Sequence, residues 1–239
     1  MLTLTGVRLC EKRYNRLLAP QFFMRQQQKG VVFLENWCII FRILVAKDAV
    51  EKGSKIDIQR RGTAMCIAAA NRIINRTNAQ NEWRSTTGKS RVKLTGKRLQ
   101  KLLYLCQLFW YIDHDESKMI TEDFQAWPNG PVIPQIYNHF SVYQDGDMCP
   151  LLHLSNSTLS EEEASLINKV VDNTIDIPTE AIIDYTHLPN GPWAQVYSGN
   201  QGLYNTISKD SIKYYIRNPD HQTELFEFIQ DGQKYECNG

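Results

Sequence analysis

Hydrophobic positions recur at helical spacing through the middle of the chain and become hard to read toward the N-terminus. From Thr63 onward, an apolar stripe predicts a helix that ends near Arg76, and it consists of Ile67, Ala70, Ile73 and Ile74. A clearer stripe follows Thr95, a residue suited to cap a helix, and it consists of Leu99, Leu102, Leu103, Cys106, Phe109 and Trp110. The two stripes predict the central helices of a folded domain.

Turn and capping signals divide the rest of the chain. Residues 119–127 predict an extended segment, and the following Pro128-Asn129-Gly130-Pro131 predicts a bend. Pro131 suits the first turn of a helix whose inward side would hold Ile133, Ile136, Tyr137 and Phe140. Ser160 and Glu163 form a capping box, and further helices are expected to begin at Pro178 and Ser208.

These patterns predict a mainly α protein with an N-terminal extension. Residues 1–62 hold one apolar run of helical spacing, over 31–45, and end in a polar segment, 47–62, that resembles a linker. We expect a compact helical domain over residues 63–220 with at most one short β-hairpin, and a C-terminal tail over 221–239.

Charge is distributed unevenly, although the net charge of the whole chain is only +1. Residues 1–102 contain 21 Lys and Arg against 6 Asp and Glu, a net charge of +15, and residues 103–239 contain 6 against 20, a net charge of −14. A basic segment can attract nucleic acid or the acidic part of its own chain. We expect the second, with Arg72, Arg76, Lys97 and Lys101 opposed by acidic groups beyond residue 103.

Several classes of function lack their sequence signatures. Gly88-Lys89-Ser90 resembles the end of a phosphate-binding loop, but Trp83 stands where that loop needs a glycine. The five histidines are isolated and the six cysteines show no zinc-binding spacing, so we expect no cofactor, no metal and no catalysis. Without a signal peptide or a membrane span, the sequence predicts a cytoplasmic protein with reduced thiols.

Three segments in order resemble the Panacea (SocA-like) antitoxin family. Residues 94–104, LTGKRLQKLLY, are similar to the family's opening helix. Residues 122–137, EDFQAWPNGPVIPQIY, are similar to its "F-x-AW-x-x-GPV-x-P-x-VY" signature, and residues 186–193, THLPNGPW, to its "TH…PW" signature. The sequence departs from the family at Gly96, which weakens the start of the first helix, and in the 62 residues that precede the domain.

The resemblance implies a mainly helical fold without known catalysis, and an antitoxin that binds a toxin encoded beside it, in a phage or mobile-element context like that of the related GepA-type proteins. We expect a mixed aromatic and charged contact surface, drawn from residues 122–137 and 186–197. The candidate partner-binding residues are Gln125, Trp127, Asn129, Gly130, Pro131, Val132, Tyr137, His187 and Trp193. Trp193 also fits the interior, where large aromatic residues usually lie, and Lys97 and Lys101 fit a solvated basic helix face.

Two other roles remain open at this point. As in the SocA branch, the protein could act as an adaptor that delivers the toxin to a cytosolic protease. It could also be a regulator that binds nucleic acid through its basic N-terminal part, although the charge is not accompanied by a recognisable groove-reading motif.

Overall fold

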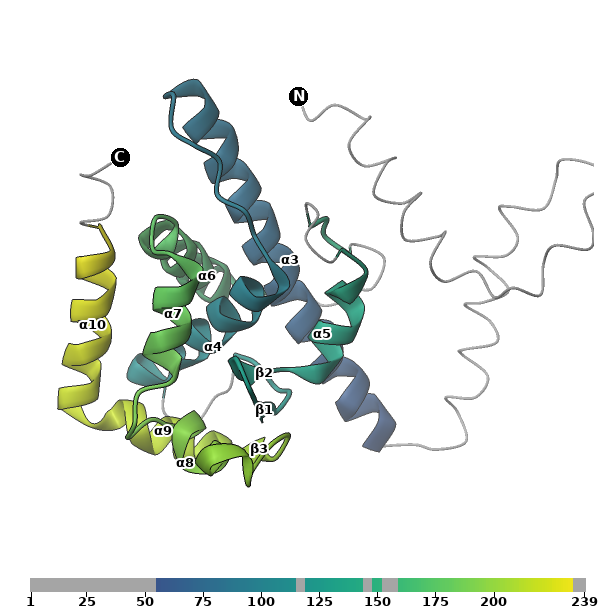
Figure 1. Cartoon of the computed structure of the whole chain (residues 1–239). Coiled ribbons are helices and arrows are strands. Elements are labelled where there is room, and N and C mark those ends of the chain that lie inside the picture. Colours follow the sequence, from purple (N-terminus) through teal and green to yellow (C-terminus); the bar gives the residue numbers. More distant parts are fainter. Residues whose placement is uncertain (1–54, 115–118, 144–147, 152–158, 234–239) are drawn as a thin grey trace, which may run out of the picture. The chain divides into compact units, whose positions relative to one another are not determined.

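A computed structural model describes residues 55–114, 119–143, 148–151 and 159–233 (Figure 1). The part from Gly62 onward forms one unit. As predicted, helices dominate it. They are α3 (Lys55–Thr86), α4 (Gly96–Asp113), α5 (Pro134–Phe140), α6 (Glu161–Thr174), α7 (Thr179–Thr186), α8 (Pro192–Tyr197), α9 (Lys209–Arg217) and α10 (Pro219–Gln233).

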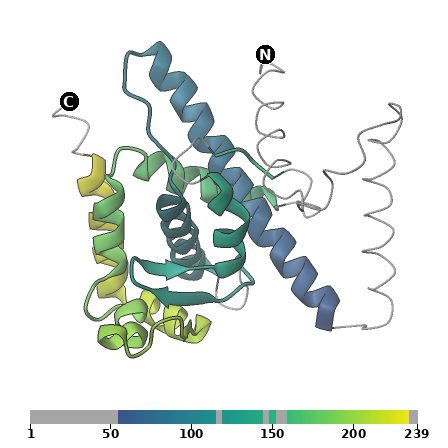
Figure 2. The ribbon, with the colours of Figure 1, turned by 45° about the vertical axis from the view of Figure 1, so that its right-hand side comes forward.

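Helix α4 is the core of this unit. Thr95 caps it, as predicted, because the Thr95 hydroxyl accepts a hydrogen bond of 3.2 Å from the backbone N–H of Arg98. The helix packs against α5, α6, α7, α9 and strand β2 (Gly130–Val132), and Figure 2 shows the hairpin that contains β2 in front of it. All but one of its predicted core positions are buried, and Phe109 is half-buried. The apolar stripe predicted for α4 therefore lies at the centre of the domain.

The predicted β-hairpin is present and belongs to a sheet of order β2-β1-β3, with β1 at Phe124–Trp127 and β3 at Thr206–Ile207. Sequence reasoning placed Pro131 in a helix, and this was wrong. Pro131 pairs with Ala126 in β2, and the helix begins at Pro134 instead. Strand β2 lies at the edge of the sheet, where a residue without an N–H is tolerated.

Helix α3 is longer than predicted at both ends. It begins at Lys55, so the segment expected to be a linker over 47–62 is helical from that residue on, and it continues to Thr86. The rest of the N-terminal extension lies outside the described residues.

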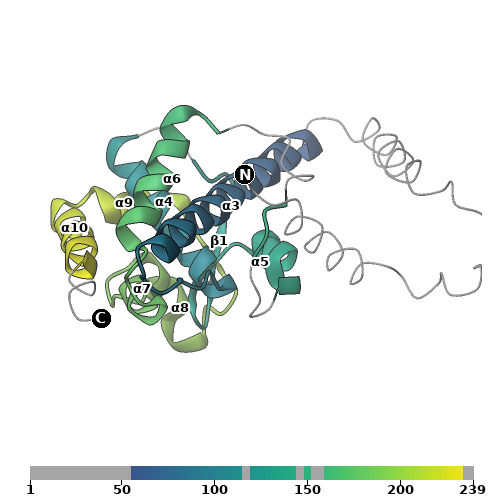
Figure 3. The same cartoon turned by 90° about the horizontal axis from the view of Figure 1, so that it is seen from above.

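Helices α3 and α6 lie side by side (Figure 3), and one of the predicted charge contacts joins them. The Arg76 guanidinium donates hydrogen bonds of 2.7 and 2.5 Å to the two carboxylate oxygens of Asp172, and Arg84 lies 2.5 Å from Asp176. Arg72 donates instead to the neutral amide oxygen of Asn168. Compensation thus holds for Arg76 and does not hold in the predicted form for Arg72.

Buried polar groups join α4 to the C-terminal end of α6. Arg98 is 2% exposed, and its guanidinium donates to the backbone carbonyls of Thr174, Ile175 and Ile177 at 2.5, 3.2 and 2.7 Å. Those carbonyls lie at and just beyond the end of α6, where a helix leaves its last carbonyls without intrahelical N–H partners. The Thr174 carbonyl also accepts a hydrogen bond of 3.0 Å from the backbone N–H of Ile177. One side chain of α4 therefore supplies a donor to all three carbonyls at the end of α6.

The C-terminal segment differs from the tail that the sequence predicted over 221–239. Helix α10 fills residues 219–233, and it packs against α6 and α9 with Leu225 and Ile229 buried. The domain therefore extends beyond residue 220.

Two further expectations concern the thiols and the membrane. Cys66 and Cys106 are free, buried thiols, as expected for small apolar residues on α3 and α4. Cys149 is in a disulfide bond, so the expectation of reduced thiols does not hold for it. In the described part of the chain, helices fall short of the length and apolar character that crossing a membrane requires.

Candidate functional site

The three segments that carry the family resemblance meet at the turn of the hairpin. Gly130 in that turn has a φ of +95°, a conformation that favours glycine. A Cβ atom added there would lie 2.7 Å from Oγ1 of Thr186 and 2.8 Å from Nζ of Lys101. The first segment supplies Lys101, the second Gly130 and the third Thr186. Their contact explains why the chain needs a glycine at this position.

Lys101 lies inside the protein and not on the solvated face that we expected. Its side chain is 1% exposed, and its ammonium donates a hydrogen bond of 2.8 Å to the backbone carbonyl of Pro131. Lys97, one turn earlier, is exposed. Burial, and secondarily the charge of Lys97, lower the pKa of Lys101 to about 7. Lys97 and Lys101 lie one turn apart on the same side of α4, but they do not form one basic surface. That side of the helix is exposed at Lys97 and buried at Lys101.

A second contact joins the hairpin to the third segment. The indole Nε1 of Trp193 donates a hydrogen bond of 2.9 Å to the backbone carbonyl of Trp127. The Trp193 side chain is buried, as we expected, between His187 and Tyr197. Its ring stacks on those of His187 and Tyr197 at centroid distances of 3.8 and 4.5 Å. The hydrogen bond fixes the position of α8 against β1, and the stack holds the Trp193 ring in place.

His187 is half-buried against Trp193. Burial, and secondarily the charge of Lys101, lower the pKa of His187. Its Nε2 atom is buried and accepts or donates no hydrogen bond among the described residues. The ring thus serves here as a flat packing surface for Trp193.

Three aromatic side chains contact one another at the protein surface, and we call them the aromatic patch: Trp127, Tyr137 and Tyr204. The half-buried ring of Trp127 lies between the other two, at 4.9 Å from the Tyr137 ring and 5.2 Å from the Tyr204 ring. Tyr137 is 46% exposed and Tyr204 is 55% exposed. Tyr137 was predicted both to face inward and to contact a partner, and the structure supports only the outward position.

Sequence reasoning missed Tyr204. Its backbone N–H donates a hydrogen bond of 2.8 Å to the carbonyl of Ala126, and this places the ring beside Trp127. Tyr204 lies 77 positions after Trp127 and has a φ of +66°, which is unusual for a residue with a side chain. Neither the contact nor the conformation has a local sequence signal.

The remaining candidate residues divide into a surface group and a buried group. Asn129 is exposed at the tip of the hairpin, and half-buried Gln125 accepts a hydrogen bond of 3.1 Å from the Trp127 indole. Gly130, Pro131 and Val132 are buried. We therefore assign these three, with Trp193, to the scaffold that supports the aromatic patch.

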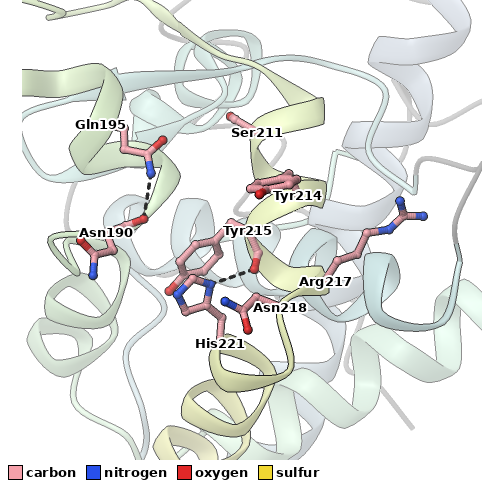
Figure 4. Close-up of a pocket in the computed structure, with 8 residues that line it drawn as sticks. All are labelled: Asn190, Gln195, Ser211, Tyr214, Tyr215, Arg217, Asn218 and His221. Atoms are coloured by element: carbon pink, nitrogen blue, oxygen red, sulfur yellow. Dashed lines mark hydrogen bonds between the residues drawn. The ribbon is translucent and has the colours of Figure 1, made fainter.

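A polar hollow of about 740 Å³ lies where α8, α9 and the start of α10 come together (Figure 4). Asn190 and Gln195 lie on one side of it, and residues of α9 with the stacked pair of Tyr215 and His221 lie on the other. The His221 Nδ1 atom is 2.9 Å from the backbone carbonyl of Tyr215. The hollow adjoins the third segment but contains none of the residues that join the segments together.

Comparison with known proteins gives one result for this region. Residues 99–194 match the family model described as antitoxin SocA-like, Panacea domain. No curated protein and no solved structure matches the chain. The matched range spans α4 to the first turn of α8, and so it includes the hairpin and the residues joined around Gly130.

Proposed function

We propose, from the match of residues 99–194 to the SocA-like antitoxin Panacea domain, that the chain is the antitoxin of a toxin–antitoxin pair. It neutralises its toxin by direct protein–protein contact through the aromatic patch. The observation that carries the proposal is the exposure of two tyrosines on either side of Trp127, at the place where the three family segments meet.

The chemistry of the patch suits protein recognition. Tryptophan and tyrosine are enriched among the residues that contribute most of the binding energy at interfaces, because they bury a large area with few rotatable bonds. Here the area is also held in place. The Trp127 backbone is fixed by Trp193, and the Tyr204 backbone by Ala126. A rigid surface loses little entropy when a partner binds.

The role is proposed as binding without catalysis, because three of the four described histidines that could act as acids or bases stack on aromatic rings. His114 stacks on Trp110 with the ring centroids 3.6 Å apart, and His187 stacks on Trp193. His221 stacks on Tyr215 in the polar hollow. The proposed partner is the toxin, and the proposed role requires no cofactor.

Co-expression tests the proposal. The protein encoded in the neighbouring reading frame is expressed alone and together with this chain, and growth is measured. We expect growth arrest by the neighbour alone, rescue by the wild-type chain, and loss of rescue in the double variant Tyr137→Gln/Tyr204→Asn. Glutamine suits the helical position of Tyr137, and asparagine tolerates the positive φ of Tyr204. Tyr214→Gln is the matched control, because Tyr214 on α9 is 84% exposed and is not one of the three residues of the patch.

Rescue by the double variant with normal expression would remove the aromatic patch from the proposal, and absence of a toxic neighbour would remove the antitoxin role.

The toxin's half-life, measured with and without this chain, separates masking from delivery to a protease. A stable, inactive toxin supports masking, and a shortened half-life supports the adaptor role.

Nucleic-acid binding is the weaker alternative for the described residues. The guanidinium groups of Arg76 and Arg84 on α3 are engaged by carboxylates of the chain itself, and Arg72 is engaged by an amide. Phosphate binding would have to replace these contacts.

A further inference from the structure

Two long segments of the chain contain no Asp, Glu, Lys or Arg: residues 124–144 and residues 185–208. Charged residues make up 22% of the sequence, so these 45 positions would hold about ten at that frequency. The gap in charge is notable in a protein whose two parts carry net charges of +15 and −14. Of the two segments that we expected to form a mixed aromatic and charged surface, 122–137 and 186–197, only Glu122 and Asp123 carry charge.

The two uncharged segments come together in the folded protein. Strand β1 in the first pairs with β3 in the second, with Phe124 opposite Ile207 and Gln125 opposite Thr206. Where this strand pairing ends, the adjoining charged residues of the two segments, Asp123 and Lys209, lie 3.4 Å apart and compensate each other. Uncharged residues that are distant in sequence thus gather on one part of the protein, and the aromatic patch is built from them.

The exposed residues next to the three rings along the chain are uncharged, and three of the four carry side-chain amides. They are Pro128, Asn129, Asn138 and Asn205. Side-chain amides can donate and accept hydrogen bonds without bringing a charge. The patch therefore offers aromatic area in its centre and hydrogen-bonding groups around it.

The loop that presents Tyr204 is held in an unfavourable backbone conformation. Ser198, Asn200 and Tyr204 have φ angles of +40°, +79° and +66°. A Cβ atom at Gly202 would lie 1.7 Å from the carbonyl oxygen of Val196, so only glycine fits there. Residues with side chains adopt such angles at a free-energy cost, and they cluster at sites of function. In this loop, the unfavourable backbone conformation places the Tyr204 ring in edge-to-face contact with Trp127.

We propose that the aromatic patch recognises an uncharged polypeptide segment, one that presents apolar side chains and backbone amides and no Asp, Glu, Lys or Arg at the contact. This inference rests on the proposed antitoxin function and specifies the partner's surface. Transfer of a charged group onto a surface without a counter-charge is unfavourable, whereas neutral apolar groups gain from burial. Binding through this patch is accordingly independent of salt concentration.

The test does not require the toxin. A random peptide library displayed on phage is selected on the immobilised full chain in ~0.5 M NaCl, where long-range attraction between charges is screened. We expect the enriched peptides to contain fewer charged residues than the unselected library. A synthetic copy of an enriched peptide should bind with a Kd that changes by less than about twofold between ~0.05 and ~0.5 M NaCl.

Variants locate the binding. Tyr204→Asn should weaken binding of the synthetic peptide by about tenfold or more, as expected for loss of an aromatic hot spot, while Tyr214→Gln leaves it unchanged. Melting curves of both variants establish that they are folded. Retained binding by a folded Tyr137→Gln/Tyr204→Asn variant would overturn the inference, because the patch would then be dispensable.

Charged enriched peptides, a Kd that rises with salt, or no enrichment over an empty support would also overturn the inference. Failure of the antitoxin proposal looks different. In that case the chain selects uncharged peptides through Tyr204 and still gives no rescue from the neighbouring gene product. Rescue of growth combined with charged or absent peptides would instead retain the antitoxin role and remove only the uncharged contact.

Discussion

The guanidinium of Arg98 donates a 2.5 Å hydrogen bond to the backbone carbonyl of Thr174, and it also satisfies the carbonyls of Ile175 and Ile177. Because the site is buried, replacing Arg98 with methionine removes the side-chain donor from all three carbonyls, and only the Thr174 carbonyl keeps a backbone donor, the N–H of Ile177. We expect Arg98→Met to lower the free energy of unfolding by about 3 kcal/mol in urea titrations. Arg91→Met at an exposed position is the control, with an expected change within about 0.5 kcal/mol. Equal stability of the two variants would contradict this assignment.

The Gly130 turn provides a second prediction. Gly130→Ala combines a positive φ with a clash against Thr186 and Lys101, so we expect a loss of roughly 3 kcal/mol in unfolding free energy. Gly88→Ala separates the two effects, because Gly88 has a φ of +76° and no heavy atom within 4 Å of the added Cβ. Its expected loss is about 1 kcal/mol. If both variants lose the same amount, steric contact at Gly130 is not important.

Lys101 should make stability depend on pH. The ordinary pKa of lysine is 10.5, and burial lowers that of Lys101 to about 7. Between these values the unfolded chain binds more protons than the folded one, so unfolding becomes less favourable as pH rises. We expect the free energy of unfolding to increase by roughly 2 kcal/mol from pH 7 to pH 9 through this group. Lys101→Met should remove that increase, and urea titrations at both pH values measure the difference between the two proteins.

Other groups that titrate in this range remain in both proteins, so the difference reports Lys101 together with its effect on the neighbouring His187, whose pKa the charge of Lys101 lowers. The same pH dependence in the variant would mean that Lys101 is neutralised by another route. Methionine also removes the donor to the Pro131 carbonyl, which costs about 1 kcal/mol at every pH.

Helices α3 and α6 supply a prediction about salt. Arg76 and Asp172 are each about one-third exposed, so we expect a double-mutant cycle with alanine to give a coupling of about 1 kcal/mol. The coupling should fall in ~1 M NaCl, because exposed charges are screened. A parallel cycle for Arg72 and Asn168, whose contact involves one neutral partner, should depend less on salt. Identical salt dependence in the two cycles would argue against an ion pair at Arg76.

The domain boundary gives a further prediction. A fragment of residues 55–239 retains all of α3 and should fold with a cooperative thermal transition, because the part from Gly62 onward forms a unit of its own. An insoluble fragment, or one that melts without cooperativity, would show that the preceding residues are needed. A second fragment that ends at residue 218 should be less stable, since it lacks the buried Leu225 and Ile229 of α10.

Elements whose signals are local could be predicted from the sequence. Thr95 and Ser208 cap their helices, and Ser160 and Glu163 form both hydrogen bonds of the predicted capping box. In each case a side chain meets a backbone group three residues away, so the neighbouring sequence contains all the necessary information. The hairpin turn at Gly130 is predictable for the same reason.

Positions decided by distant contacts could not be predicted. The spacing of Lys97 and Lys101 places them on one side of α4, but only the packing of the hairpin shows that this side is buried at Lys101. Pro131 resembled a helix start, and an edge strand accommodates proline equally well. Tyr204 joins the aromatic patch through a left-handed backbone that its own sequence does not favour.

The pairing of β1 with β3 sets the time at which the patch first exists during synthesis. Gln125 finds its partner only when Thr206 has been made, 81 residues later. At a synthesis rate of about 5 to 20 residues per second, the ribosome needs roughly 4 to 16 seconds to cover that distance. A nascent chain that already contains α4 and the hairpin therefore lacks Tyr204, and a cell gains the proposed protection only from chains that are nearly complete.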